Sequence, residues 1–501
     1  TATFGDGTGT LLLNGGSILS TGTRSGLPIS NPVVMTTDAT IYGNSTASAP
    51  SSRIIPFSGN WTVSSGTLRI GNTGLANNTF EARFIAGNNV TWPVVVGDPA
   101  FDTAGAISVF ELYDSNTNPV QMVSGLISGG GVVRRGNLAA GTGGTSVFTG
   151  DNTYSGGTVL DSGTIGIGLD STPTSGTLTS GPLGTGTFEI DNDPTIFVFA
   201  SGGARTIGNR IFLNGVTNTV FNGANALTFS GIVNLGGTAK TLTVSNTAPV
   251  TFSGQLTNSA AIITAGPGKL ILSGDNSSRT NTTTVNAGTL LVNNTAGSGT
   301  GSGAVAVISG GTLGGTGTLG GTVTFASGAQ AYLYKTAGFP DSPLTLSSNL
   351  TLNGNTVMVD LGGTTTLGAG TYRLLNFAGS LSGSFNATPT IVNGSLASGN
   401  AATISLSTPN QVNLVVAPAS STPPGFPPGS LSRLPSGNIS LTATGVVSTP
   451  YRLWASTNLA LAPVTNAWTL LQSGTIPSSP FTNYDLTATN FPQRFYLFST
   501  P

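Results

Sequence analysis

Short apolar runs alternate with threonine along most of this chain, and glycine separates one run from the next. The alternation is clear at 227–229 (LTF) and 241–244 (TLTV), where a period of two places the apolar residues on one face and threonine on the other. Other runs are wholly apolar but short, such as 94–96 (VVV), and none approaches the roughly 18 residues that a membrane-spanning helix needs. The pattern therefore predicts an all-β chain made of short strands.

One combination of strand and corner occurs twice. The stretch TGDNTYSGGTVLDSGTI at 149–165 returns, altered, as SGDNSSRTNTTTVNAGTL at 273–290, and a denser glycine-threonine run, GTLGGTGTLGGTV, fills 311–323. A unit of this size cannot bury its apolar face alone, so such units stack into a solenoid with one continuous core. The residues that define the repeated motif are Gly150, Asn152, Tyr154, Gly156, Gly157 and Gly163, with Gly274, Asn276 and Gly288 in the second copy.

These three stretches resemble autotransporter-associated β-strand repeats. The second copy departs from the motif at 277–279 (SSR), so we expect that corner to be rebuilt. The resemblance implies a right-handed parallel β-helix on a secreted or surface-exposed passenger protein, and it specifies fold and export better than activity.

Composition narrows the chemistry. The 501 residues include 73 glycines, no cysteine, no histidine, and only 16 Lys and Arg against 17 Asp and Glu. Catalysis by a Ser-His or Cys-His pair is thereby excluded, as is a disulfide framework. A formal charge of −1 and a pI near 5.3 offer no basic surface for nucleic acid. The start at Thr1, without methionine, is what a processed export product would show.

Four regions are predicted. Residues 1–145 form an N-terminal cap and the irregular first part of the solenoid, with an excursion from the coil at 93–119, and residues 146–416 form the regular solenoid with its repeats. A proline-rich linker follows at 417–433, because proline cannot join a ladder. Residues 434–501 are rich in aromatic residues and predict a small β-sandwich. This last part resembles a C-terminal module of secreted repeat proteins from Verrucomicrobia-type bacteria.

Two sets of acidic residues are the candidates for chemistry. Alternation places Glu189, Asp191 and Asp193 on one strand face, which suits a Ca²⁺ site or a glycosidase carboxylate pair, or else is simply a solvated strand end. The second set lies in the irregular N-terminal region, where arginines could neutralise a uronate. It consists of Asp98, Asp102, Glu111 and Asp114, with Arg83, Arg134 and Arg135 as the cations.

The sequence favours a secreted structural protein, without enzyme activity or cofactor, that self-associates into an extracellular or cell-surface fibre. A solenoid has two exposed ladder ends, and a low surface charge favours association. A donated strand containing Phe4, Leu11, Leu12 and Leu13 could join one copy to the next. Two alternatives remain open. One is an adhesin that binds surface polysaccharide, and the other is a β-helix polysaccharide lyase or hydrolase. The candidate glycan contacts are Trp454, Trp468 and Tyr484.

Overall fold

The computed structural model shows a chain that is almost entirely β. It describes residues 8–22, 28–47, 50–85, 89–113, 120–136, 144–191, 197–215, 217–335, 343–363, 366–418, 424–447 and 449–500. In these ranges the helical segments are short turns, α1 (Val464–Ala467) and η1 (Ala488–Asn490). No helix in the described ranges has the length and apolar character needed to cross a membrane.

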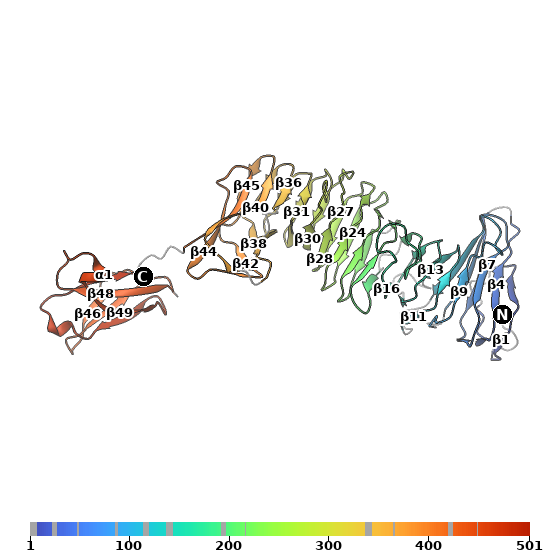
Figure 1. Ribbon diagram of the computed structural model, residues 1–501, viewed down its shortest axis with the longest axis horizontal. Coiled ribbons are helices and arrows are strands. Elements are labelled where there is room, and N and C mark those ends of the chain that lie inside the picture. Colours follow the sequence, from blue (N-terminus) through green and yellow to red (C-terminus); the bar gives the residue numbers. More distant parts are fainter. Residues whose placement is uncertain are drawn as a thin grey trace. The chain divides into compact units, whose positions relative to one another are not determined.

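Up to Val416 the chain winds through long parallel sheets (Figure 1). The first sheet has nine strands, from β5 (Ser52–Phe57) to β26 (Leu256–Thr257). The second has twelve, from β11 (Gln121–Val123) to β41 (Leu381–Ser382), and the third has nine, from β19 (Arg205–Ile207) to β42 (Thr390–Val392). From β19 to β26 successive strands belong to different sheets, so the chain visits each of the three sheets once per coil there. This arrangement is consistent with a parallel β-helix.

One coil shows the path. β20 (Ile211–Leu213) lies in the first sheet, β21 (Asn218–Phe221) in the second and β22 (Leu227–Phe229) in the third, and β23 (Val233–Asn234) returns to the first. β22 pairs with β25 (Val250–Phe252) so that each residue lies opposite the residue 23 positions later. This offset varies along the stack, from 18 between Leu313 and Ala331 to 33 between Ile167 and Ala200.

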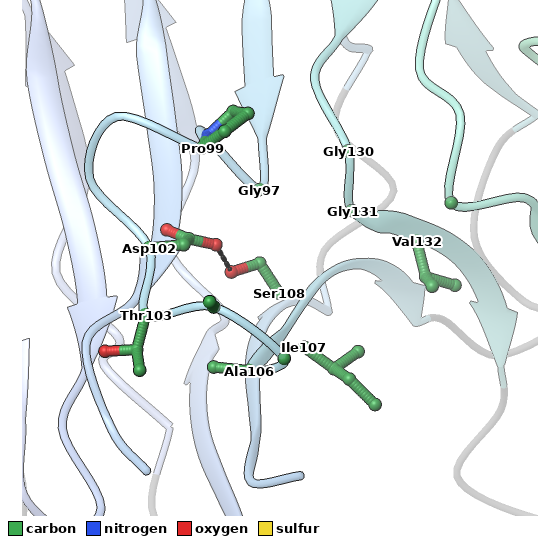
Figure 2. Close-up of a pocket in the computed structure, with 13 residues that line it drawn as sticks. Gly97, Pro99, Asp102, Thr103, Ala106, Ile107, Ser108, Gly130, Gly131 and Val132 are labelled. Carbon is green, nitrogen blue, oxygen red and sulfur yellow. Dashed lines mark hydrogen bonds between the residues drawn. The ribbon is translucent and has the colours of Figure 1, made fainter. Parts of the chain in front are cut away.

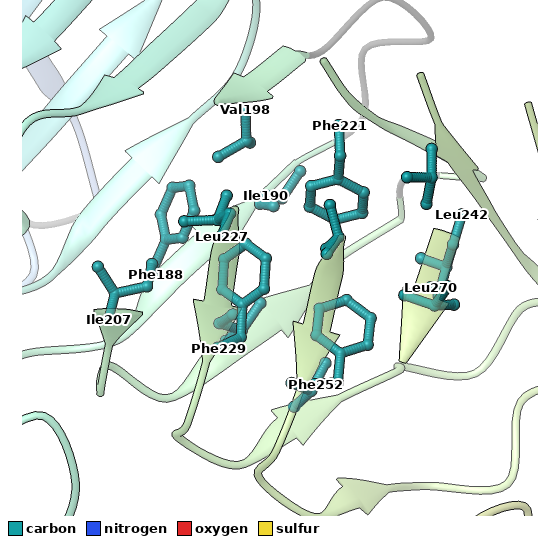
Figure 3. Packing of buried hydrophobic residues seen from close by; sticks show 14 of the residues in the cluster. Phe188, Ile190, Val198, Ile207, Phe221, Leu227, Phe229, Leu242, Phe252 and Leu270 are labelled. Atoms are coloured by element: carbon teal, nitrogen blue, oxygen red, sulfur yellow. The ribbon is translucent and has the colours of Figure 1, made fainter. Parts of the chain in front are cut away.

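The core is the inside of the coils. Apolar residues at alternate positions of every strand point inward and stack on their counterparts one coil away, as Phe229 does on Phe252, with ring centroids 5.2 Å apart (Figure 3). On β22, Thr228 lies between the inward residues Leu227 and Phe229 and is only half-buried. The predicted alternation of apolar and threonine positions therefore has a direct structural cause.

The N-terminal region is more regular than the sequence indicated. β1 (Leu11–Leu13), β3 (Val33–Met35) and β6 (Trp61–Val63) already form a parallel ladder. Within the expected excursion at 93–119, β9 (Val94–Val96) and β10 (Ile107–Tyr113) both pair in register with neighbouring coils. Both strands have apolar residues facing the core, so among the described residues of that stretch the connection at 97–106 is the main departure from the coil.

Antiparallel pairing ends the parallel ladder. β40 (Gly370–Phe377) continues from β36 (Leu344–Leu346) in parallel but pairs with β45 (Gln411–Pro418) in antiparallel fashion. β44 (Asn400–Ser405) follows as the last strand of this sheet.

The second compact unit comprises Ala417–Pro501 together with Ser398–Ala401. It contains a sheet of β46 (Leu431–Arg433), β47 (Ile439–Ala443) and β50 (Phe481–Asp485), and a sheet of β49 (Thr469–Thr475), β48 (Pro450–Ser456) and β51 (Phe495–Ser499). The paired strands run antiparallel. Both sheets contribute to one buried cluster, formed by Leu441, Ala443, Tyr451, Leu453, Ile476, Phe481 and Phe498.

Candidate functional site

The repeated Gly-Asp-Asn corner places its asparagine inside the stack, where the side chain joins three coils. Asn152 is fully buried, its Oδ1 accepts from the N–H of Ile127 at 2.8 Å, and its Nδ2 donates to the carbonyl of Pro182 at 2.7 Å. Asn276 makes the equivalent two bonds with the coils before and after it, at 2.6 and 2.7 Å. Each amide thus satisfies one backbone donor and one acceptor that would otherwise be buried without partners.

Glycines beside these corners allow the coils to approach closely. A Cβ added at Gly150 would lie 2.5 Å from the carbonyl oxygen of Gly125, and one at Gly274 would lie 2.4 Å from that of Gly254. At Gly156 the corresponding distance, to the Gly131 oxygen, is 2.3 Å. These distances leave no room for a side chain.

Three further motif glycines adopt left-handed backbone conformations. Their φ angles are 98° at Gly157, 78° at Gly163 and 66° at Gly288. Residues with a Cβ rarely adopt this region. Close approach and positive φ therefore account for all the glycines of the predicted motif.

The altered corner of the second copy is rebuilt around an arginine. Tyr154 is fully buried and its hydroxyl lies 2.5 Å from that of Thr158. Arg279, also fully buried, takes the equivalent place four residues before Thr283 and donates to the carbonyl of Thr300 at 3.0 Å. Burial lowers the pKa of Arg279 to about 10. The buried arginine was not foreseen, although the rebuilding of the corner was.

Charged side chains gather on the outer face of the first sheet, across β8 (Thr79–Phe84), β10 and β13 (Val132–Gly136). We call this the charged face and define it as Glu81, Arg83, Glu111, Arg134 and Asp161. The register places Arg83 directly opposite Glu111, and Glu111 opposite Arg134. The strands therefore bring together charges that lie about one coil apart in sequence.

Ion pairs connect this face continuously. Arg83 Nη2 lies 2.6 Å from Glu81 Oε1, and Arg83 Nε lies 2.5 Å from Glu111 Oε2. Arg134 contacts Glu81 Oε2 through Nη1 and Asp161 Oδ2 through Nε, both at 3.1 Å. The side chains of both glutamates are only 3% exposed, so these two carboxyl groups are shielded from water, whereas Arg134 and Asp161 are about one third exposed.

The pKa values of Glu81 and Glu111 are shifted in opposite directions. Desolvation, reinforced by the hydrogen bond and negative charge of Glu81, raises the pKa of Glu111 to about 9 despite the opposing effect of Arg83. Desolvation also acts to raise the pKa of Glu81, but the hydrogen bond from Glu111 and the charges of Arg83 and Arg134 outweigh it and leave that pKa lowered. At neutral pH Glu111 therefore holds a proton, while Glu81 is ionised.

An acid beside a carboxylate is the pairing that glycoside hydrolysis uses. Here Arg83 binds both carboxyl groups, and its guanidinium carbon lies 3.9 Å from the ring centroid of Tyr113. Each carboxyl group is therefore already bound by this arginine through one of its oxygens. As it stands, the arrangement holds a proton and ties three strands together.

The first predicted acidic set lies near this face. Glu189 is on β17 (Phe188–Ile190), where its Oε1 accepts from Asn214 Nδ2 at 2.6 Å, and Asp191 follows the strand. Desolvation, opposed by Arg134, raises the pKa of Asp161, and the charges of Asp191 and Glu189 add to the rise. Asp193 lies outside the described residues. Among the described residues, no three acidic side chains converge as metal ligands would.

The second predicted set is divided between separate places. Asp98 pairs with Arg69 at 2.9 Å, Glu111 lies on the charged face, and Asp114 is outside the described residues. Asp102 lines a hollow of about 490 Å³ with Gly97, Ile107, Gly130 and others, where its Oδ2 accepts from Ser108 Oγ at 2.6 Å (Figure 2). Desolvation raises the pKa of Asp102, although bonds from Ser108 and the Asn72 N–H oppose the rise.

The arginine group also divides, because neighbours on a strand face opposite sides. Arg134 lies on the charged face, whereas Arg135 points inward and is fully buried, with Nη1 donating to the Leu112 carbonyl at 3.1 Å. Sequence reasoning missed Glu81 and Asp161. The Glu81-Ala82-Arg83 spacing was the available signal, since a period of two places both charges on one face.

The predicted assembly strand is part of the fold. Leu11–Leu13 form β1, paired in parallel with β3, and Leu12 is 59% exposed while Leu13 is buried. Phe4 lies outside the described residues. Strand donation by β1 would require it to leave β3, so this role stays a prediction.

The three predicted glycan-contact aromatics differ in exposure. Trp454 and Trp468 are 5% and 9% exposed, and their indole N–H groups bond to Ser499 Oγ and to the Leu461 carbonyl. Tyr484, on β50, is 53% exposed. Of the three, only Tyr484 presents a ring on which a sugar could stack.

The fold and its corners define a repeat-built, parallel-coil β protein, and comparisons with known proteins agree with that class. The passenger-associated-transport-repeat family matches residues 140–167 and 262–292, which contain the two copies of the corner. The chain is also 31% identical to the "Adhesin BmaC autotransporter" of Brucella suis biovar 1 (strain 1330) over 27% of its own length. It spans 5% of that relative. The similarity is thus to autotransporter passenger repeats and suggests a secreted or surface-located protein.

Proposed function

We propose that this chain is an extracellular or cell-surface structural protein of the passenger type. The observation that carries the proposal is the corner motif, in which Asn152 and Asn276 each join three coils while glycines allow the coils to touch. Such corners serve the continuity of a long stack. The passenger-repeat match and the similarity to an autotransporter adhesin support the location.

Two finer points of architecture belong to the proposal. The coils are right-handed, because crossovers between parallel strands of one sheet almost always are. The two C-terminal sheets are the halves of a small sandwich, since both contribute to one buried cluster. The C-terminal module's resemblance to Verrucomicrobia-type secreted proteins stays a prediction.

The chain acts without catalysis in this proposal. Its strongest acid–base candidates, Glu81 and Glu111, are 3% exposed and already bound by Arg83. A polysaccharide lyase or hydrolase remains the alternative, and the hollow beside Asp102 is the place to test it. Release of unsaturated or reducing sugar that disappears in Asp102→Ala would overturn the non-catalytic proposal.

The proposed function includes self-association of the chain into fibres. Only 7% of the residues are charged, so copies repel one another weakly. Negative-stain electron microscopy of the purified chain at rising concentration tests this, and regular filaments are the expected result. Isolated particles at every concentration would contradict it.

The location has its own test. Antibodies raised against the purified chain should label intact cells of the source organism, or its extracellular fraction, and external protease should remove the cell-bound signal. Labelling that requires permeabilised cells would contradict an extracellular or surface location, whatever the microscopy shows.

Adhesion to surface polysaccharide is a second candidate, favoured by the similarity to an adhesin and by the exposed Tyr484. Binding of the full chain to a glycan array, weakened in Tyr484→Ala but not in Thr482→Ala on the same strand, would support it. Thr482 is an exposed residue of β50 as well, so it controls for a general disturbance of that strand.

A further inference from the structure

One edge strand of the C-terminal unit is longer than the other edge strands and contains no charged residue. In the described part of this unit, the edge strands of the two sheets are β46, β50, β49 and β51. β46 contains Arg433, β50 ends at Asp485, and β51 begins directly after Arg494. β49 has seven residues, against three, five and five in the others, and none of its residues is charged or proline.

β49 is also open to solvent. Six of its seven residues are exposed, and its one neighbour in the described ranges is β48. Leu470 on β49 lies opposite Trp454, and so does Leu497 on β51. An apolar row therefore crosses the sheet from Leu497, 39% exposed, to Leu470, 45% exposed at the open edge.

An edge of this kind is a template for a further strand. Its outward N–H and C=O groups can pair with any extended segment, and proteins usually prevent this with charge, proline or a very short edge. β49 has none of these three protections. Its one irregularity is a bulge at Leu471, where the register against β48 shifts by one residue, so the stretch open to regular pairing begins at Gln472.

We propose that β49 pairs with β49 of a second copy of this chain, joining two three-stranded sheets into one. Two identical uncharged strands related by a two-fold axis can form hydrogen bonds between their outward backbone N–H and C=O groups, so that neither strand remains an open edge. Few charges oppose the contact. Residues 417–501 contain Arg433, Arg452, Asp485 and Arg494, of which Arg494 pairs with Asp485 at 2.7 Å and Arg452 lies on the neighbouring strand β48, opposite Ser473. The pairing also covers the end of the apolar row at Leu470.

This inference deepens the proposed self-association by naming one contact surface. A two-fold pairing joins chains in twos, so a fibre needs a second contact elsewhere on the chain.

Sedimentation equilibrium of the full chain, over a range of concentrations, tests the pairing. At concentrations below those at which filaments form, the wild type should show a reversible monomer–dimer step. Gln472 is the middle residue of β49, and we place the two-fold axis there. Gln472→Lys adds a charge at this exposed position and should raise the Kd of this step by about two- to fivefold, because like charges then face each other across the new pair. The matched control is Ser432→Lys, at another exposed position, on edge strand β46, which should leave the Kd unchanged.

A mixture separates loss of pairing from misfolding. Gln472→Lys and Gln472→Glu should each dimerise weakly alone, and mixed together they should dimerise at least as well as the wild type. A wild type that stays monomeric overturns both this pairing and the proposed self-association. Association that is insensitive to charge at Gln472, or that the mixture does not restore, overturns the β49 contact and leaves self-association standing.

Discussion

Glu111→Gln should remove a pH dependence of stability that the charged face creates. Because the pKa of Glu111 is raised to about 9, the folded chain holds a proton there through the range in which the unfolded chain, with the ordinary pKa near 4.5, has lost it. The contribution of Glu111 to stability is therefore fully present below the unfolded pKa and is lost as the pH rises through the folded pKa. Glutamine cannot ionise and imitates the protonated group.

One proton gives the magnitude. Where the folded state binds one more proton than the unfolded state, the free energy of unfolding falls by about 1.4 kcal/mol per pH unit. From about pH 5.5 to about pH 8.5 the wild type should lose at most about 4 kcal/mol through this group. The Gln variant should lose none of that portion, so its stability relative to the wild type should rise steadily with pH.

Urea unfolding followed by tryptophan fluorescence measures the difference. Trp61 packs on Phe84 at 5.0 Å between ring centroids, and Phe84 ends the strand that carries Glu81, so this indole reports on the same coils. Glu189→Gln is the matched control, since Glu189 lies on the first sheet outside the ion-pair network. Equal pH slopes for wild type and Glu111→Gln would refute the assignment of the proton to Glu111.

Three further outcomes are expected. Asn276→Ala leaves a buried N–H and a buried carbonyl without partners and should lower the free energy of unfolding by about 2 to 5 kcal/mol. Asn286→Ala, at an exposed site nearby, should change it little, and similar effects at the two sites would contradict the role of Asn276 in joining the coils. Gly254→Ala places a Cβ 1.9 Å from the Gly231 oxygen and should cost about 3 kcal/mol or more, while Gly237→Ala meets nothing within 4 Å and should be tolerated. Chelation with EDTA tests the calcium hypothesis: an unchanged melting temperature is expected, because no carboxylate cluster in the described ranges resembles a metal site, and a clear drop would support a Ca²⁺ site.

Local pattern predicted the strands and the corners, because both depend on neighbours in sequence. The inward and outward positions of β22 follow from period two, and the glycines and Asn152 follow from the repeated motif. Grouping Arg135 with Arg134 as an available cation was wrong, because adjacent residues of a strand face opposite sides and Arg135 is buried. What is local in the chain was therefore largely predictable.

The charged face was not predictable as a unit. Glu81 and Glu111 are 30 positions apart and meet only because the coils between β8 and β10 have a particular length. Coil length varies from 18 to 33 along the chain, so the sequence cannot tell which charges will lie opposite each other. The burial of Trp454 could not be predicted either, because an aromatic residue of a small domain suits its core and its surface equally well.

The variation in coil length has a consequence for how such a chain can change. The ladder keeps its pairing whether 18 or 33 positions separate one strand from its partner, because the extra residues leave through connections outside the strands. Residues inserted at those connections therefore leave the pairing of the strands unchanged. During evolution such a chain can gain, lose or exchange surface segments while its core stays the same. Two relatives can therefore share the stack of coils and differ entirely in their surface loops.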